Sequence, residues 1–285
     1  MLAIVCPGQG SQTPGFLAPW LELDGTRDLL ASLSDAAGVD LIRHGTESDE
    51  ETIKDTAVAQ PLIVAAGLVA AAALEADAAA PKSTVVAGHS VGEVTAAAVT
   101  GVLSPAEALS LVRVRATGMA RAAAATPTGM AAVVGGDQDE VLAAIDAAGL
   151  TPANVNGAGQ IVAAGTAEAL GALAESAPAR ARVIPLKVAG AFHTEHMRPA
   201  VDDLAAHVAD LSPSDPRLPL LSNRDGEAVE SGTDVLARIV DQVTRPVRWD
   251  LCMATMATRQ VTGVLELLPG GTLRSSPRAG SYTHL

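Results

Sequence analysis

The residues best suited to chemistry lie in the segment Val85 to Glu93, which reads VVAGHSVGE. A short apolar run typical of a buried strand meets a G-x-S-x-G sequence centred on Ser90, and a helix-forming segment follows it. This context predicts a nucleophile elbow, because the glycines permit a strained turn that exposes the serine hydroxyl. The following amide N–H can then face a developing oxyanion. The simpler alternative is a strand-to-helix turn whose serine only caps the helix.

A serine nucleophile needs a general base, and two histidines after Gly190-Ala191-Phe192 are candidates. His193 and His196 lie where a loop is expected to lead into a helix that runs to about Leu211. The N-terminus of a helix favours the neutral imidazole that a base requires. Either residue could instead be an ordinary surface histidine. A metal site built from the two histidines and Glu195 is weak, since no further ligand clusters with them.

A cation inside an apolar row is the third chemical signal. The segment from Ser104 to Ala124 begins with a capping box and predicts a helix. Arg115 shares one face of that helix with Leu111 and Met119, and no acid lies three or four residues away to pair with it. Its guanidinium therefore either reaches water while its stem packs, or meets an anion from elsewhere.

The first strand is expected at Leu2 to Cys6, and the glycine-punctuated loop Pro7 to Gln12 follows it. Such a loop can present backbone N–H groups to a neighbouring site. A nucleotide site is disfavoured, because Gly8-Gln9-Gly10 lacks the third glycine of a dinucleotide fingerprint and the lysine of a P-loop. The loop is therefore a candidate donor of hydrogen bonds rather than a phosphate cradle.

The elements that must position these residues change character at Gly129 and again after Val188. Between those points the pattern predicts strand, helix, strand, strand, helix and strand, which is the order of a ferredoxin-like βαββαβ unit. We therefore expect a large α/β domain over 1–128 and 189–285, with an inserted small domain over 129–188. Later elements are expected as a loop over 245–249, a short helix over 256–260 and a last strand over 263–267.

Composition excludes several other classes of protein. The chain has 285 residues, 48% of them hydrophobic and 18% charged, which is typical of a globular protein. A net charge of −13 and only 2% aromatic residues argue against a nucleic-acid partner. Two cysteines, Cys6 and Cys252, suit a reducing compartment. We see no signal peptide, and the apolar run from Pro61 to Leu74 is shorter than a bilayer span and predicts a buried helix. The sequence thus predicts a cytoplasmic protein with no membrane partner.

Taken together and in order, five motifs resemble the malonyl-CoA:acyl carrier protein transacylase family, which serves fatty acid and polyketide synthesis. The resemblance runs from Leu2 to about Leu273. It implies a hydrolase-like α/β large domain with an inserted ferredoxin-like (βαββαβ) domain, the same layout that the residue patterns predict. The motifs are Gly8-Gln9-Gly10-Ser11-Gln12, Gly88-His89-Ser90-Val91-Gly92-Glu93, Arg115, Gly190-Ala191-Phe192-His193, and Gln242 followed by Arg245-Pro246-Val247-Arg248-Trp249.

The resemblance implies a role for each matched residue. Ser90 would be the nucleophile and His193 its base, and the region of Gln242 would orient the base in place of a carboxylate. The N–H groups of Val91 and Gln9 would form the oxyanion hole. Arg115 would hold the malonyl carboxylate. The remaining substrate-binding positions are His89, Phe192, Gln242 and Asn156, and Phe192 is similar to the residue of malonyl-selective members.

The resemblance also implies partners, and this chain departs from the family pattern in one respect. Malonyl-CoA would be a substrate and acyl carrier protein the acceptor, with no cofactor and no metal, and a monomer is expected. Basic residues that could meet the acidic carrier are Arg113, Arg121, Lys187, Arg245 and Arg248. Family members usually end in a basic stretch and a closing helix, whereas this chain ends in RSSPRAGSYTHL, which predicts a disordered tail.

Two other functions use the same residues differently. A serine hydrolase or thioesterase with the same elbow would release the acyl group to water, and it would want an Asp or Glu on the base. That reading gives Arg115 no role. A non-catalytic module that only docks a carrier protein would not need Ser90, His193 and Arg115 all intact.

Overall fold

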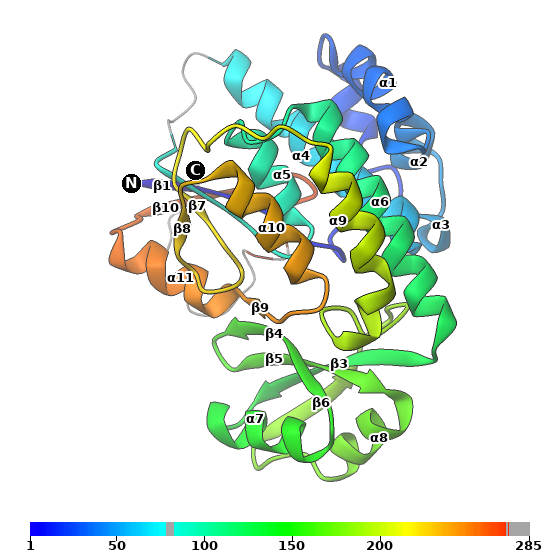
Figure 1. Ribbon diagram of the computed structural model, residues 1–285, viewed down its shortest axis with the longest axis vertical. Helices are drawn as coiled ribbons and strands as arrows, with labels where there is room; N and C mark the ends of the chain where they lie inside the picture. The colour runs from blue at the N-terminus through cyan, green and yellow to red at the C-terminus, as the bar shows by residue number, and fades with distance from the viewer. Residues whose placement is uncertain (78–82, 272, 274–285) are drawn as a thin grey trace.

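The computed structural model describes residues 1–77, 83–271 and 273, and the proposed tail from 274 onward lies outside these residues. Its strands form two sheets of five strands each, one within a large helical body and one in a smaller unit beside it (Figure 1). The fold is therefore the α/β type that the sequence predicts, with a second sheet in the smaller unit.

The first sheet has the order β10-β1-β2-β7-β8. Strand β1 (Leu2–Cys6) pairs in parallel with β2 (Val85–Gly88) and with β10 (Gly263–Glu266), and β2 pairs in parallel with β7 (Leu220–Leu221). The short β8 (Ala228–Val229) closes one edge in antiparallel fashion. Because alternate residues of β1 and β2 pack into different apolar clusters, the sheet is buried on both faces, as parallel sheets usually are.

Helices cover that sheet and form most of the core. The largest cluster of buried apolar side chains joins α4 (Thr56–Ala76), α5 (Gly92–Val99) and α6 (Pro105–Ala125) to one face of the sheet. The capping box expected at Ser104 and Glu107 is present at the start of α6. The other helices are η1 (Ala18–Glu22), α1 (Thr26–Ala37), α2 (Leu41–Thr46), α3 (Glu50–Lys54), η2 (Glu195–Ala200), α9 (Val201–Ala209), α10 (Gly232–Gln242) and α11 (Trp249–Thr258).

Helix α4 contains the apolar run that the sequence analysis noted. At 21 residues with a mean hydropathy of 2.1 it is longer than that run, and within the described ranges it alone could cross a membrane by length and composition. However, 67% of its most apolar window is buried inside the protein, and a core helix passes the same test. The prediction of a buried helix is confirmed.

The second sheet has the order β6-β3-β5-β4-β9. Its first four strands are β3 (Thr128–Gly135), β4 (Thr151–Gly157), β5 (Gln160–Thr166) and β6 (Ala181–Pro185), with α7 (Gln138–Ala147) and α8 (Ala167–Glu175) between them. The βαββαβ order is therefore confirmed, and the central strands pair antiparallel. The domain limits given by the sequence stay a prediction.

Two local predictions are wrong. Residues 247–248 form the strand β9 rather than a loop, and β9 extends the small sheet by pairing in parallel with β4. The next helix, α11, begins at Trp249 instead of residue 256. Its N-terminus has no side-chain cap, and its buried Trp249 and Cys252 pack on the large sheet. Tertiary packing thus extends a helix whose start carries no capping signal.

Candidate active site

Ser90 lies in the tight turn between β2 and α5, with a φ angle of 54°. This left-handed conformation is strained for a residue other than glycine, and such strain is common at functional sites. Both flanking glycines are required, since a Cβ on Gly88 would lie 2.1 Å from the Gly92 carbonyl carbon and one on Gly92 would lie 2.1 Å from the Cys6 carbonyl oxygen. The predicted nucleophile elbow is therefore present in geometry.

Replacing Gly92 with alanine should prevent the elbow from forming. The added Cβ would overlap backbone atoms of β1, which cannot move without breaking the sheet, so we expect loss of soluble folded protein or a fall in the thermal midpoint of about 10 °C or more. A matched control is Gly171→Ala in α8, where no atom lies within 4 Å of the added Cβ. In that variant the free energy of unfolding should rise by about 0.5–1 kcal/mol, because alanine has a higher helix propensity than glycine. Equal melting curves for the two variants would contradict the steric argument.

His193 lies against the serine. The Ser90 hydroxyl donates to Nε2 of His193 over 2.7 Å, and the opposite ring nitrogen, Nδ1, donates to the backbone carbonyl of Gln242 over 2.8 Å. Because a carbonyl only accepts, this second bond places the ring proton on Nδ1 and leaves Nε2 free to accept. The arrangement has the geometry of a serine nucleophile and its base.

Burial, rather than a helix dipole, keeps His193 neutral. The side chain is 3% exposed, and burial together with the nearby cation of Arg115 lowers its pKa to about 3. The six-residue 3₁₀ helix η2 begins two residues later, so the dipole of a long helix expected from the sequence is not the cause. The alternative base His196 is exposed, and no cluster of three metal-binding side chains exists in the part of the chain that the structure describes.

Arg115 of α6 is fully buried. Its two terminal nitrogens donate to the side-chain carbonyls of Gln60 at 2.7 Å and Gln242 at 2.8 Å, while its Nε donates to no atom within the described ranges. Burial lowers the pKa of Arg115 to about 10, and the charge of Glu93 opposes that shift. Of the two possibilities that the sequence left for Arg115, a guanidinium that reaches water is wrong, because the side chain is fully buried. A buried cation held mainly by neutral amides remains suited to an anionic ligand.

Three polar residues whose roles no local sequence pattern predicts, Glu93, Asn223 and Gln60, tie this site together. Glu93 is 5% exposed and accepts from the Asn223 backbone N–H and from the Gln242 side-chain amide. Asn223 in turn accepts from the Ser90 N–H at 2.8 Å and donates to the Gly88 carbonyl at 2.7 Å. Gln60 stood out only as one polar residue in the apolar helix α4, and Asn223 only as the polar end of a strand.

The two backbone N–H groups expected to form an oxyanion hole are those of Val91 and Gln9. In the described ranges neither the Val91 nor the Gln9 backbone N–H donates to another protein atom. Their loops touch, since a Cβ on Gly8 would lie 2.9 Å from the His89 carbonyl oxygen. One unpaired N–H on the residue after Ser90 and a second on a neighbouring loop are the kind of donors from which an oxyanion hole is built.

Of the other candidate residues, His89 and Asn156 lie where the elbow meets β4, and Phe192 lies in the apolar core. His89 donates from Nε2 to the Asn156 side-chain oxygen at 2.9 Å, and its ring meets Trp249 edge to face at 5.7 Å. This bond joins the elbow to β4 of the small sheet. Phe192 is 8% exposed and packs in the main apolar core next to His193. None of these contacts places His89, Phe192 or Asn156 on the reacting serine itself.

The class of protein follows from this geometry. A strained serine on an elbow, a neutral histidine at 2.7 Å and open backbone amides are the parts of an enzyme that acts through an acyl-serine intermediate. The base is oriented by a backbone carbonyl rather than by the carboxylate that a hydrolase would want. The buried Arg115 adds a cation to the same site.

Known proteins agree with this class. The family described as acyl transferase domain matches residues 3–273. The malonyl CoA-acyl carrier protein transacylase of Mycobacterium tuberculosis H37Rv is 53% identical over 274 residues, 96% of this chain and 91% of the relative. That of Escherichia coli K12 is 33% identical over 279 residues, 95% and 90% of the two chains. The chain therefore belongs to the acyl transferase domain family, among the malonyl CoA-acyl carrier protein transacylases.

Solved structures give the same result. The crystal structure of MCAT from Mycobacterium tuberculosis matches with a TM-score of 0.94 at 52% identity, covering 97% of this chain and 92% of that one. A type II PKS acyl-carrier protein in complex with its malonyl-transacylase includes a chain that matches with a TM-score of 0.90 at 29% identity, covering 96% and 90%. The fold predicted from the sequence is therefore confirmed.

Proposed function

We propose that this enzyme moves the malonyl group from malonyl-CoA to the phosphopantetheine thiol of acyl carrier protein through a malonyl ester on Ser90. The observation that carries the proposal is the hydrogen-bonded pair of Ser90 and neutral His193 in one site with the buried cation of Arg115. The names of the relatives support the same substrate and acceptor. The hydrolase alternative lacks a supporting observation of its own.

In the first half-reaction the Ser90 oxygen attacks the thioester carbonyl of malonyl-CoA, and His193 Nε2 takes the hydroxyl proton. The oxyanion of the tetrahedral intermediate accepts from the N–H groups of Val91 and Gln9, each such donor being worth roughly 3–4 kcal/mol in other enzymes. The carbon–sulfur bond then breaks, and His193 returns its proton to the departing CoA sulfur. The products are free CoA and the malonyl-serine ester.

The second half-reaction runs the same steps toward the new thiol. The phosphopantetheine sulfur attacks the ester carbonyl while His193 accepts the thiol proton, and the ester C–O bond breaks as the Ser90 oxygen takes that proton back. The cycle is ping-pong, because CoA leaves before the carrier protein reacts. A low pKa keeps His193 in the accepting form at the start of each half-reaction.

Arg115 supplies the selectivity for an acidic acyl group. Its charge is already removed from water at a desolvation cost, and its partners Gln60 and Gln242 are neutral, so a malonyl carboxylate can replace or join them with a gain in Coulomb energy. The unpaired Nε is a further donor for the ligand. His89, Phe192, Gln242 and Asn156 would complete the walls of the acyl site.

The localisation, oligomeric state and pathway that we propose rest on membership of the family. We place the protein in the cytoplasm as a monomer that feeds fatty acid or polyketide synthesis, with no cofactor, membrane or nucleic-acid partner. The acidic carrier protein would approach a local basic surface despite the net charge of −13. Exposed Arg121 and Arg245 each lie beside an aspartate, so the carrier would compete with Asp203 and Asp241 for them.

Mass spectrometry of the intact protein tests the proposed reaction. Brief mixing with malonyl-CoA should add one malonyl group, which peptide mapping should place on Ser90, and later addition of holo acyl carrier protein should move it to the carrier. Apo carrier protein, which lacks the phosphopantetheine thiol, is the control and should leave the adduct in place. An adduct lost to water as fast as it forms, with none on the carrier, would favour the hydrolase.

A further inference from the structure

We propose that Glu93 is a positioning residue for malonyl selectivity, because its carboxylate fixes the amide orientation of Gln242 and thereby gives Arg115 an acceptor. This inference deepens the proposed function and rests on it. Glu93 lies in the first turn of α5, three residues after Ser90, and its carboxylate accepts from Asn223 and Gln242. Of its two hydrogen-bond partners, Gln242 is the one that contacts Arg115.

Four hydrogen bonds hold the side-chain amide of Gln242. Its side-chain nitrogen donates to Glu93 Oε2 at 2.6 Å, the shortest of its bonds, and to the Ser90 carbonyl and Asn223 Oδ1 at 3.2 Å each. Its side-chain oxygen therefore faces Arg115 and accepts from the guanidinium at 2.8 Å. The two ends of one amide thus face an anion and a cation, and a flip would place a donor against Arg115.

Of the three acceptors that hold the Gln242 nitrogen, the carboxylate is the nearest and the only charged one. Its other oxygen, Oε1, is committed to the Asn223 backbone N–H, which cannot accept. A proton on Glu93 would therefore sit on Oε2 and point at the Gln242 amide nitrogen, donor against donor. Gln242 would then be held only by its two longer bonds, to the Ser90 carbonyl and Asn223 Oδ1, and the acceptor that it offers Arg115 beside that of Gln60 would be held less firmly. The backbone carbonyl that orients His193 need not move with the side chain.

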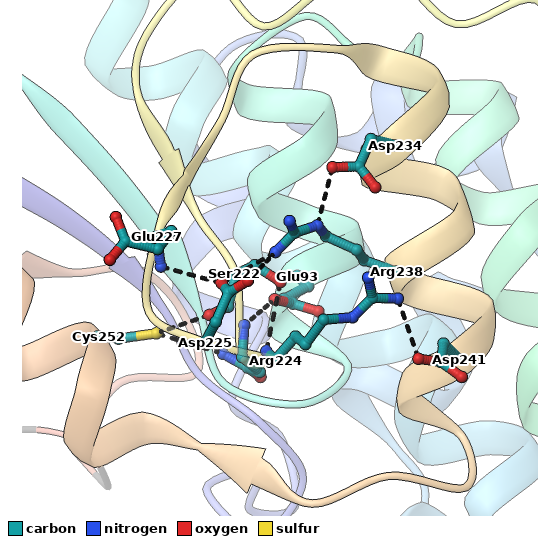
Figure 2. Close-up of polar contacts among 10 residues, drawn as sticks. Glu93, Ser222, Arg224, Asp225, Glu227, Asp234, Arg238, Asp241 and Cys252 are labelled. Carbon is teal, nitrogen blue, oxygen red and sulfur yellow. Dashed lines mark hydrogen bonds and ion pairs between the residues drawn. The ribbon is translucent and has the colours of Figure 1, made fainter.

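The surroundings of Glu93 bring its pKa close to neutral pH. Burial raises its pKa to about 7, while the Asn223 N–H and the cations of Arg115 and Arg238 oppose that rise and Asp225 adds to it. Figure 2 shows Glu93 beside Ser222, whose carbonyl accepts from Cys252, and Arg238 bound to both Asp225 and Asp234. Cys252 stays protonated, because burial raises the pKa of its thiol. The charged groups around Glu93 thus come from α6, α10 and the turn after β7.

The test compares two acyl donors in one protein. The ratio of kcat/KM for malonyl-CoA to kcat/KM for acetyl-CoA cancels the pH dependence of CoA, Ser90 and His193, which both donors share. Glu93→Gln should lower this ratio at pH 8 at least about tenfold, while acylation of Ser90 by the neutral ester p-nitrophenyl acetate stays within about threefold. The matched control is Asp225→Asn, an acid-to-amide change on the outer side of Arg238, which should leave the ratio unchanged.

The wild-type protein gives a second test that needs no variant. Since the folded pKa of Glu93 is raised, the carboxylate is present above about pH 7 and is lost as the pH falls through that value. The malonyl-to-acetyl ratio should therefore fall between pH 8.5 and 6 in the wild type and be flat in Glu93→Gln. A ratio that is flat in the wild type, or unchanged within twofold in Glu93→Gln, would overturn the inference. So would an equal loss in Asp225→Asn. A wild type that transfers no malonyl would instead overturn the proposed function.

Discussion

Ser90→Ala is expected to lower the rate of malonyl transfer by about 10,000-fold or more, which is the scale seen when a nucleophile is deleted in other serine enzymes. Without the hydroxyl no acyl ester can form, so both half-reactions stop and His193 has no proton to accept. The measurement is the steady-state transfer of malonyl to the carrier protein, with mass spectrometry of the acyl-enzyme. We expect no adduct on the variant.

The structure also predicts that this variant folds normally. Alanine and serine share the same strain at a φ of 54°, and the backbone bond from residue 90 to Asn223 does not use the hydroxyl. The thermal midpoint of Ser90→Ala should therefore match that of the wild type. Ser90→Gly is a useful companion, because it relieves the strain and should be as inactive. An adduct that persists in both variants would show that another residue is the nucleophile.

Arg115→Ala is expected to remove most of the preference for malonyl-CoA. Deleting one partner of a desolvated charge pair costs about 2–5 kcal/mol, and we expect kcat/KM for malonyl-CoA to fall about 100-fold or more. Acetyl-CoA carries no carboxylate for Arg115 to bind, so its kcat/KM should stay within about threefold or rise. Single-turnover acylation with each donor gives the two values.

The control for this change lies on the same helix. Arg113 of α6 is exposed, and Arg113→Ala removes a cation two residues away without touching the buried network. It should leave the preference for malonyl-CoA as it is. If Arg115→Ala slowed acetyl and malonyl transfer equally, the guanidinium would be a structural cation that holds Gln60 and Gln242, and the carboxylate-binding role would be wrong.

Much of the site could be predicted because its residues sit in local motifs. The elbow around Ser90 is one short segment in which glycine, serine and glycine have a fixed spacing, so strand, turn and helix follow from a few neighbours. The βαββαβ unit is likewise made of local periodicities and turns. Arg115 could be singled out because helical spacing alone places it in an apolar row without an acid.

The polar network around these residues could not be predicted in the same way. Glu93, Asn223 and Gln242 lie far apart in the chain, and only the pairing of β2 with β7 brings the end of one strand beside the elbow. Likewise, Gln60 of α4 meets Arg115 only because α4 packs against α6. Such contacts depend on the order of strands and the packing of helices, which no local spacing records.

The sequence by itself singled out the candidate nucleophile, the two candidate bases and the cation, since each is marked by residue type and short-range spacing. The tertiary structure decided between His193 and His196, because only His193 is buried within 2.7 Å of Ser90. It also decided why that histidine is neutral and why Arg115 is held by amides instead of water. Burial and long-range hydrogen bonds set these states, and both exist only once distant segments have packed together.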